Sequence, residues 1–260
     1  MLIFNVASGA AGVNDTGQTQ CYDVANTAVP CSAAVGGDAG VNPRQDGRYG
    51  RDPAFPAGQY VKTGAGSAGF DYSKISNSGV VLLASAALGS APGEWACTRD
   101  NVTNLVWEVK APSVPSGLRS GHTYSWYSTD NANNGGSAGV GSVGMDSCNG
   151  TLFNYGNKCN TQNFVAAVNA VGLCGKSDWR LPARNELLTL VHSGQISPAT
   201  IDSTYFPNTG PSYYWSRNTA VGAVGNAWSV NFGDGIFGPA SSTTSAKAST
   251  FLVRLVRTGP

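Results

Sequence analysis

The chain has 260 residues, a formal net charge of +1 and only 12% charged residues, and 34 of its residues are glycine. This composition argues against a helical cytosolic enzyme and favours a body rich in loops and strands, folded as one large domain or two small ones. Because the net charge is close to zero, charge alone would not hold nucleic acid or a strongly anionic glycan, and we expect no nucleic-acid partner.

Residues 1–94 contain many turn-forming dipeptides, such as Asp46-Gly47 and Asp52-Pro53, and few helical patterns. We therefore predict an irregular, strand- and turn-rich N-terminal arm. Within it, the apolar run over residues 80–84 predicts a buried strand, although a helical turn has the same pattern. The apolar start at residues 2–4 is too short for a signal peptide or a membrane span. We expect export after removal of a leader, or by another route such as assembly into a phage particle.

From Trp95 onward the pattern indicates a compact domain, which we place at residues 95–260. Residues 105–110 predict a strand, and residues 128–150, rich in Asn, Gly and Ser, predict a surface loop. Thr161 then offers an N-cap to a helix that Gly172 ends. The apolar side chains that share one face of this helix are Phe164, Val165, Val168 and Val171.

A second helix is predicted over residues 184–192, closed by Gly194. Pro182 precedes it, and proline cannot continue a strand ladder but fits the first turn of a helix. The residues that fall on its apolar face are Leu187, Leu190 and Val191. Downstream, three more strands are predicted over residues 213–216, 227–232 and 251–256.

The segment from Asp178 to Leu188, together with residues 214–216 and 251–257, resembles the DUF1566 family, also called the Legionella collagen-like protein C-terminal domain. The resemblance continues through residues 17–23, 95–101 and 105–108. This family is similar to the C-type-lectin-like fold group, which also contains the formylglycine-generating enzymes. The resemblance implies an α+β fold: a C-type-lectin-like domain with two short helices, near 161–172 and 184–193, and twisted antiparallel strands. Its N- and C-terminal strands are expected to lie together.

Six cysteines without a Cys-x-x-Cys pair indicate disulfides rather than a zinc or thioredoxin-like site. Such bridges persist outside the cytoplasm, whereas free thiols are the alternative. Pairing close neighbours gives Cys21 with Cys31 and Cys148 with Cys159, and it leaves Cys97 with Cys174. Spacing alone does not select among the connectivities that six cysteines allow.

Two glycine-rich strings match enzyme motifs only by letter. Residues 135–139 spell the nucleophile elbow of hydrolases and residues 139–144 a dinucleotide-binding fingerprint, but neither has the flanking strand and helix that its chemistry requires. His122 and His192 have no metal-ligand partner close by in the sequence. Formylglycine-generating enzymes use paired cysteines near their C-terminal end, whereas this chain has none after Cys174. We expect no catalytic site, no metal site and no cofactor.

The segment Asp130-Asn131-Ala132-Asn133-Asn134-Gly135 offers oxygen ligands suited to Ca²⁺, but it departs from the EF-hand pattern, and a solvated turn is the interpretation we favour. The Glu-Pro-Asn and Gln-Pro-Asp triplets of Ca²⁺-dependent lectins are absent. Among the tryptophans, Trp126 lies beside the polar loop and is the better candidate for a surface position, although burial is the interpretation we favour. The tryptophans expected in the core are Trp107, Trp179, Trp215 and Trp228.

The ligand-binding face is expected over residues 213–250, because the C-terminal region of C-type-lectin-like proteins resembles such a face. Apolar tips in polar turns also tend to mark contact sites. The candidate ligand-binding residues are Tyr214, Ser216, Arg217, Asn218, Asn231, Asp234, Ile236 and Phe237. Several members of the family are targets of diversity-generating retroelements in this region, and the resemblance implies the same here.

We therefore expect a non-catalytic, extracytoplasmic protein, secreted or on a cell surface or phage particle, that binds a protein or glycan ligand as an adhesin or receptor-binding protein. The alternative is a structural subunit of a surface appendage, pilus or phage tail. An enzyme of the formylglycine-generating type is third. A homo-oligomer is compatible with each of these.

Overall fold

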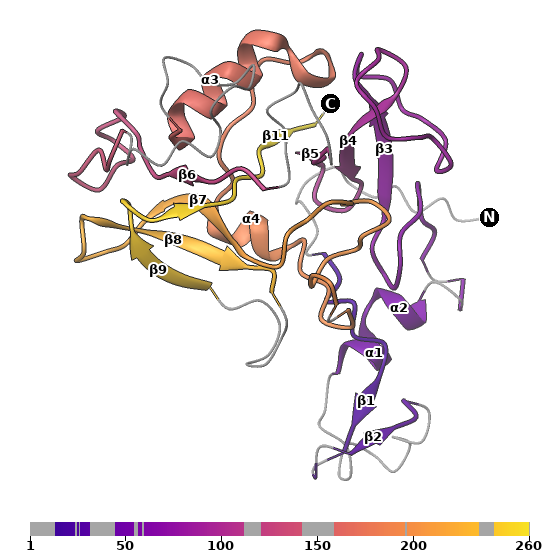
Figure 1. Cartoon of the computed structure of the whole chain (residues 1–260). Coiled ribbons are helices and arrows are strands. Elements are labelled where there is room, and N and C mark those ends of the chain that lie inside the picture. Colours follow the sequence, from indigo (N-terminus) through magenta and orange to yellow (C-terminus); the bar gives the residue numbers. More distant parts are fainter. Residues whose placement is uncertain are drawn as a thin grey trace.

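The computed structural model describes residues 14–23, 25, 27–31, 45–54, 57–58, 60–111, 121–141, 159–195, 197–233 and 242–259. These residues form short helices and small antiparallel sheets (Figure 1). The α+β class is confirmed, and the C-type-lectin-like assignment within that class stays a prediction.

The helices are α1 (Asp46–Tyr49), α2 (Arg51–Ala54), α3 (Thr161–Val171) and α4 (Arg184–Leu188), with the 3₁₀ helix η3 (Leu173–Gly175). The strands are β1 (Cys21–Tyr22), β2 (Ala28–Val29), β3 (Tyr72–Ser76), β4 (Trp95–Asp100), β5 (Leu105–Glu108), β6 (Tyr124–Ser125), β7 (Tyr213–Thr219), β8 (Asn226–Asn231), β9 (Ser242–Ala246), β10 (Thr250–Phe251) and β11 (Val256–Thr258).

The central sheet has the strand order β11-β5-β4-β3. Val256 of β11 lies opposite Trp107 of β5, so the last strand pairs with an early strand of the C-terminal domain, as the resemblance implies. β3 pairs antiparallel with β4. The sheet therefore extends across the domain boundary that the sequence predicts at residue 94, because β3 belongs to the segment we expected to be an arm.

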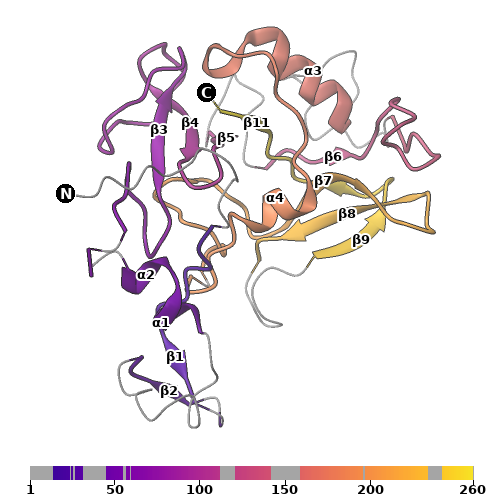
Figure 2. The same cartoon turned by 180° about the vertical axis from the view of Figure 1, so that it is seen from behind.

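Two apolar clusters cover the two faces of this sheet. Neighbouring residues of β5 show the division, because successive side chains of a strand point to opposite faces. Val106 packs in the cluster that contains Phe164 and Val168 of α3, whereas Trp107 packs in the cluster that contains Leu187 of α4. Figures 1 and 2 show α3 and α4 as separate layers around the strands.

The tryptophans follow the predictions in part. Trp107, Trp179 and Trp215 are buried, as predicted. Trp126, the better surface candidate, is only 1% exposed: its indole N–H donates to the Ser216 carbonyl at 2.9 Å, and the Lys247 ammonium lies 4.4 Å from its ring centroid. Trp228 is only half-buried, which differs from the prediction.

Charged side chains are buried where the C-terminal segment crosses the core. Arg254 is 0% exposed and donates to the Glu108 carbonyl at 2.6 Å and to the Thr209 hydroxyl at 2.7 Å. Glu108 is bound in turn by Lys110 and by the Leu255 N–H. Burial lowers the pKa of Lys110 and of Arg254. This crossing replaces the continuous strand predicted over residues 251–256, so that β10 and β11 are separate.

Helix α3 matches its predicted range, with two corrections at its ends. Its N-cap is Asn160, whose side chain accepts the Asn163 N–H at 2.9 Å, whereas Thr161 hydrogen-bonds Tyr127. Gly172 ends the helix in the left-handed conformation, as predicted. Val171 is 59% exposed and does not join the buried face.

Helix α4 begins at Arg184, as predicted, but ends at Leu188 rather than at residue 192. Beyond that point the chain continues in tighter turns, in which the Leu190 N–H donates to Leu187 and the Val191 N–H to Leu188. Other segments also bind there: Asn14 donates to the Thr189 carbonyl at 3.1 Å, and the His192 N–H donates to Thr200 at 3.0 Å. Leu190 is nevertheless fully buried. No helix among the described residues has both the length and the apolar character needed to cross a membrane.

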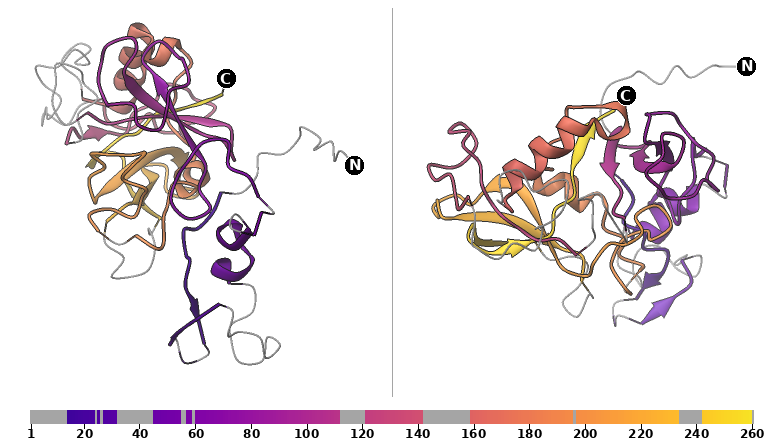
Figure 3. Two further views of the ribbon diagram at one scale, coloured as in Figure 1. Left: turned by 90° about the vertical axis from the view of Figure 1, so that its right-hand side faces the viewer. Right: turned by 45° about the horizontal axis from the view of Figure 1, so that its top comes forward.

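The hairpin of β1 and β2 and the helices α1 and α2 extend away from the sheets (Figures 1 and 3). The buried strand predicted over residues 80–84 is wrong. Val80 and Leu83 are 59% and 79% exposed, because the turn after β3 returns the chain along the edge of the sheet, where the Ser76 N–H donates to the Val80 carbonyl at 2.8 Å. This segment forms an apolar surface rather than core.

Two of the three predicted disulfides are present. They are Cys21–Cys31, within the arm, and Cys97–Cys174, which joins β4 to η3. Cys159 is also disulfide-bonded, whereas Cys148 lies outside the described residues, so the pair of these two stays a prediction.

Candidate functional site

The predicted ligand-binding residues on the β7-β8-β9 sheet divide into exposed and buried sets. Arg217 and Asn218 are exposed at the end of β7. Tyr214 and Ser216 are each 0% exposed, so they cannot contact a ligand at this surface, and their predicted role is corrected. Tyr214 packs edge to face against Phe232 with ring centroids 5.2 Å apart. The Ser216 hydroxyl donates to the Trp228 carbonyl at 2.9 Å.

Asn231 lies at the other end of the sheet from the exposed Arg217 and Asn218. It is opposite Tyr213 at the start of β7, whereas Arg217 and Asn218 come just before Thr219, which is opposite Ala227. Along β8 it has the opposite parity to Trp228, so the two side chains point to opposite faces of the sheet. Its side-chain oxygen already accepts the Gly233 N–H at 2.8 Å. The remaining predicted contacts, Asp234, Ile236 and Phe237, lie outside the described residues.

One surface of the sheet combines aromatic, cationic and amide groups. The guanidinium of Arg184 lies 4.5 Å from the ring centroid of the half-buried Trp228. The side-chain oxygen of Asn218 accepts the Arg184 N–H at 2.7 Å, which ties α4 to β7. Thr244 of β9 lies opposite Trp228 and therefore shares its face. We call this surface the Trp228 patch, and its members are Arg184, Asn218, Trp228 and Thr244. The exposed Arg217 adjoins Asn218 in the chain.

A salt bridge holds the segment before α4 in place behind this patch. Arg180 binds both carboxylate oxygens of Glu186 at 2.7 Å, and Glu186 accepts the Ala183 N–H at 2.6 Å. Burial raises the pKa of Glu186, but the hydrogen bonds from Arg180 and Ala183 outweigh it and lower the pKa below its ordinary value. The start of α4 is thereby fixed, and with it the position of Arg184.

The Trp228 patch offers what a ligand-binding surface needs. Trp228 supplies apolar area on a side chain with few rotatable bonds, and the guanidinium and amide groups supply oriented hydrogen bonds. Sequence reasoning missed Arg184, Trp228 and Thr244 as contact residues. Trp228 was assigned to the core because it lies within an apolar strand, and only the partial cover by α4 leaves it accessible.

The oxygen-rich turn at residues 130–135 uses its side chains internally. The Asp130 carboxylate accepts the Ala132 N–H at 3.0 Å and the Asn133 amide at 2.6 Å, and the Asn134 side chain accepts the Gly136 N–H at 3.0 Å. The ammonium of Lys247 binds the Asn134 carbonyl at 2.8 Å. These contacts favour the solvated turn over the Ca²⁺ loop, because a neighbouring cation repels Ca²⁺.

Ser67, His192 and Asp202 meet in the structure, a grouping that the sequence did not predict. The Ser67 hydroxyl lies 3.0 Å from His192 Nε2 and donates to Asp202 at 2.9 Å. In a catalytic triad the carboxylate binds the second histidine nitrogen and orients the ring. Here His192 Nδ1 is buried without a hydrogen-bond partner among the described residues, and burial lowers the pKa of the imidazole. The carboxylate thus binds the serine instead of the base.

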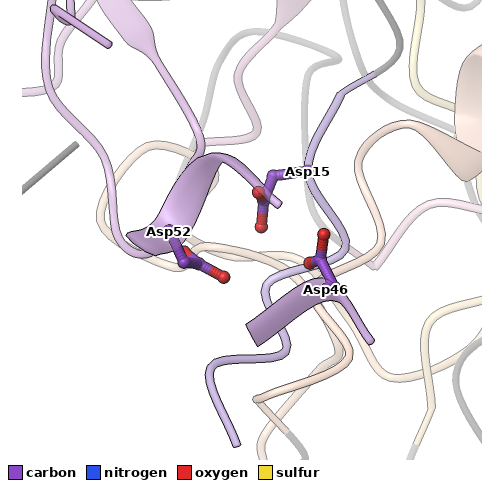
Figure 4. A group of neighbouring side chains, drawn as sticks. All are labelled: Asp15, Asp46 and Asp52. Atoms are coloured by element: carbon purple, nitrogen blue, oxygen red, sulfur yellow. The ribbon is translucent and has the colours of Figure 1, made fainter. Parts of the chain in front are cut away.

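Three carboxylates of the arm face one another (Figure 4), and their ligand atoms lie within 4.8 Å of one another. Asp15 is paired with the N–H groups of Gly17 at 2.7 Å and Arg51 at 3.2 Å. Both oxygens of Asp52 are buried without a partner among the described residues. Burial, reinforced by the charges of Asp15 and Asp46, raises the pKa of Asp52 to about 7. A retained proton accounts for the closeness of these groups, although carboxylates are also the ligands of hard cations.

Comparison with known proteins gives one finding. The model of the Lcl C-terminal domain family matches residues 96–257, which is the greater part of the chain. The matched region begins in β4 and ends in β11, and it contains every residue of the Trp228 patch. Comparisons with curated proteins and with solved structures gave no significant match.

Proposed function

The chain belongs to the Lcl C-terminal domain family, and we propose that it is a non-catalytic, extracytoplasmic protein that binds a protein or glycan ligand through the Trp228 patch. The observation that carries this proposal is the half-buried Trp228 with Arg184 against its ring and with the exposed Asn218 bound to Arg184. Large aromatic and arginine side chains contribute most of the energy in many binding surfaces.

Two further observations support a binding role outside the cytoplasm. The disulfides Cys21–Cys31 and Cys97–Cys174 are of the kind that persists in oxidising compartments. The carboxylate of Asp202 binds Ser67 rather than His192, so this group lacks the order of bonds that activates a serine nucleophile. The disulfides fit a protein that works outside the cytoplasm, and the arrangement of Ser67, His192 and Asp202 fits a protein that binds a ligand rather than one that catalyses a reaction.

The test is a screen of labelled protein against an array of glycans and an array of extracellular proteins. Asn218→Ala changes an exposed residue of the patch, Arg217→Ala changes the exposed residue next to it in the chain, and Trp228→Ala removes the aromatic ring of the patch. We expect a specific ligand of the wild type to be lost or weakened at least about tenfold by Trp228→Ala, the range typical of a central contact. Val171→Ala, at an exposed apolar position on α3 outside the patch, is the control that should bind normally.

A structural subunit is the second candidate, and one observation favours it. Val80, Val81 and Leu83 are 59%, 57% and 79% exposed and follow one another closely in the chain. Contiguous exposed apolar side chains often mark a contact with another protein chain. Size-exclusion chromatography with light scattering separates the candidates: open-ended polymers that Leu83→Ser abolishes would support the subunit, whereas a monomer or small closed oligomer supports the binder.

A further inference from the structure

A pocket of about 150 Å³ opens on the central sheet, on the face that carries η3. It lies apart from the Trp228 patch, because strands β3, β4, β5 and β11 contribute to it and none of the β7-β8-β9 sheet does. Its lining contains three cationic side chains, namely Arg99, Lys176 and Arg257.

The strand register places two of these cations on one row of the sheet. Arg99 of β4 lies opposite Val106 of β5, and Arg257 of β11 lies opposite the same valine from the other side. Directly opposite residues point to the same face, and neighbouring strands lie about 4.8 Å apart, so the two arginine Cα atoms are separated by roughly 10 Å. Lys176 follows η3 and closes the pocket from above the sheet.

Carboxylates balance only part of this charge. Arg257 is 6% exposed, and its Nε donates to Asp178 at 2.7 Å. That hydrogen bond lowers the pKa of Asp178 below its ordinary value. Arg99 donates through Nε to the neutral Asn101 side chain at 3.0 Å. Within the described chain, the terminal nitrogens of both guanidinium groups and the ammonium of Lys176 have no hydrogen-bond partner, so donors remain for an anion.

The floor of the pocket is apolar. Ile75, Val106 and the disulfide-bonded Cys174 line it between the cations. Guanidinium groups bind carboxylates and phosphates through paired hydrogen bonds, while an apolar floor favours a hydrocarbon part of the ligand. The pocket is smaller than the roughly 300 to 1,000 Å³ of sites for drug-sized ligands. We propose that it binds a small molecule whose oxyanion group, a carboxylate or a phosphate, is attached to a compact apolar body.

The experiment titrates the whole chain with benzoate, acetate and inorganic phosphate by isothermal titration calorimetry. Benzoate carries its carboxylate on an apolar ring, acetate carries it on a single methyl group, and phosphate is an oxyanion without an apolar part. The variants are Arg99→Gln and Lys176→Gln, which change accessible cations while leaving the ion pair between the buried Arg257 and the exposed Asp178 intact. Arg48→Gln in α1 removes the same charge far from the pocket and is the matched control.

We expect benzoate to bind with a stoichiometry of one and more tightly than acetate. Arg99→Gln should weaken this binding about tenfold, as the loss of one hydrogen bond to a charged group does. Arg48→Gln should leave it unchanged. Phosphate binding that falls with the same variants would support the pocket as an oxyanion site for phosphates too. The proposal is overturned if benzoate does not bind or binds no more tightly than acetate, or if Arg48→Gln weakens binding as much as Arg99→Gln.

Discussion

Asp46 and Asp52 are carboxyl groups of the N-terminal arm whose pKa is raised by burial and by the charge of neighbouring carboxylates. Asp52 lies close to Asp15 and Asp46, so a proton on its carboxyl group reduces the repulsion. The pKa of about 7 means that this proton is retained to near neutrality in the folded protein. The sequence does not reveal this group, because Asp15, Asp46 and Asp52 come together only when the arm folds.

Asp52→Asn should make the stability of the chain less dependent on pH. The folded-state pKa lies above the ordinary value of about 3.9, so the folded protein binds more protons than the unfolded chain between about pH 4 and pH 7. This group therefore makes the wild type less stable as pH rises through that window. Thermal unfolding at pH 5 and pH 8 should show that Asp52→Asn raises the melting temperature relative to wild type mainly at pH 8. Equal shifts at the two pH values would contradict the assignment.

The burial of the predicted ligand-binding residues in β7 depends on neighbouring elements that no local sequence pattern reveals. Tyr214 and Ser216 lie within a strand, where alternate residues face the core, and the sequence could not show that α4 and β6 cover both faces at that point. Arg217 and Asn218 are exposed as a ligand contact requires, because β7 runs past the edge of the core there. The exposed part of the patch was thus predicted and its aromatic member was not.

Among the elements, α3 shows what local sequence does determine. Its length, its buried Phe164 and Val168 and its end at Gly172 follow from periodicity and from the ability of glycine to adopt positive φ. The sequence did not predict the end of α4. After Leu188 the backbone bonds tighten to the third preceding residue, Asn14 binds the Thr189 carbonyl, and the His192 N–H turns to Thr200.

Gly172→Ala should destabilise the fold by about 1 kcal/mol, because in the left-handed conformation a Cβ atom lies too close to the following carbonyl oxygen. No heavy atom lies within 4 Å of the position that the Cβ would take, so the cost is in the backbone rather than in a clash. Gly172→Asn should cost less, because asparagine tolerates this conformation. Gly93→Ala, which also has open space but no positive φ, is the control. It should not destabilise the fold, because alanine there restricts the unfolded chain. Urea unfolding measures all three, and equal effects for Gly172→Ala and Gly93→Ala would contradict the reasoning.

The two described disulfides should contribute unequally. Cys97–Cys174 spans 77 residues and joins the central sheet to η3, whereas Cys21–Cys31 spans 10 residues within the arm. In the chain-entropy model the longer loop contributes roughly 4 kcal/mol and the shorter one roughly 2 to 3 kcal/mol. Urea unfolding of the double variants Cys97→Ala/Cys174→Ala and Cys21→Ala/Cys31→Ala should therefore show the larger loss for the first pair. A larger loss for the arm pair would show that native-state strain, rather than loop length, sets the difference.

For the whole molecule, the resemblance implied the α+β class and that the N- and C-terminal strands of the domain lie together. β11 pairs with β5, and the family match covers the same region. The sequence did not predict that β3 completes the sheet, because a β-strand of mixed polar and apolar residues such as Tyr72–Ser76 has no distinctive period. The cationic pocket depends on that strand as well as on β11, from opposite ends of the chain. Such sites arise from topology and are not visible in any local motif.

The central claim is that this chain recognises its ligand at the Trp228 patch. The most direct measurement is the Kd for the strongest array hit, determined by surface plasmon resonance for the wild type, Trp228→Ala and Arg99→Gln, with melting temperatures as a check on folding. The account predicts a Kd at least about tenfold higher for Trp228→Ala and an unchanged Kd for Arg99→Gln, because a central aromatic contact dominates binding. A Trp228→Ala variant that is folded and binds as tightly as the wild type would contradict it.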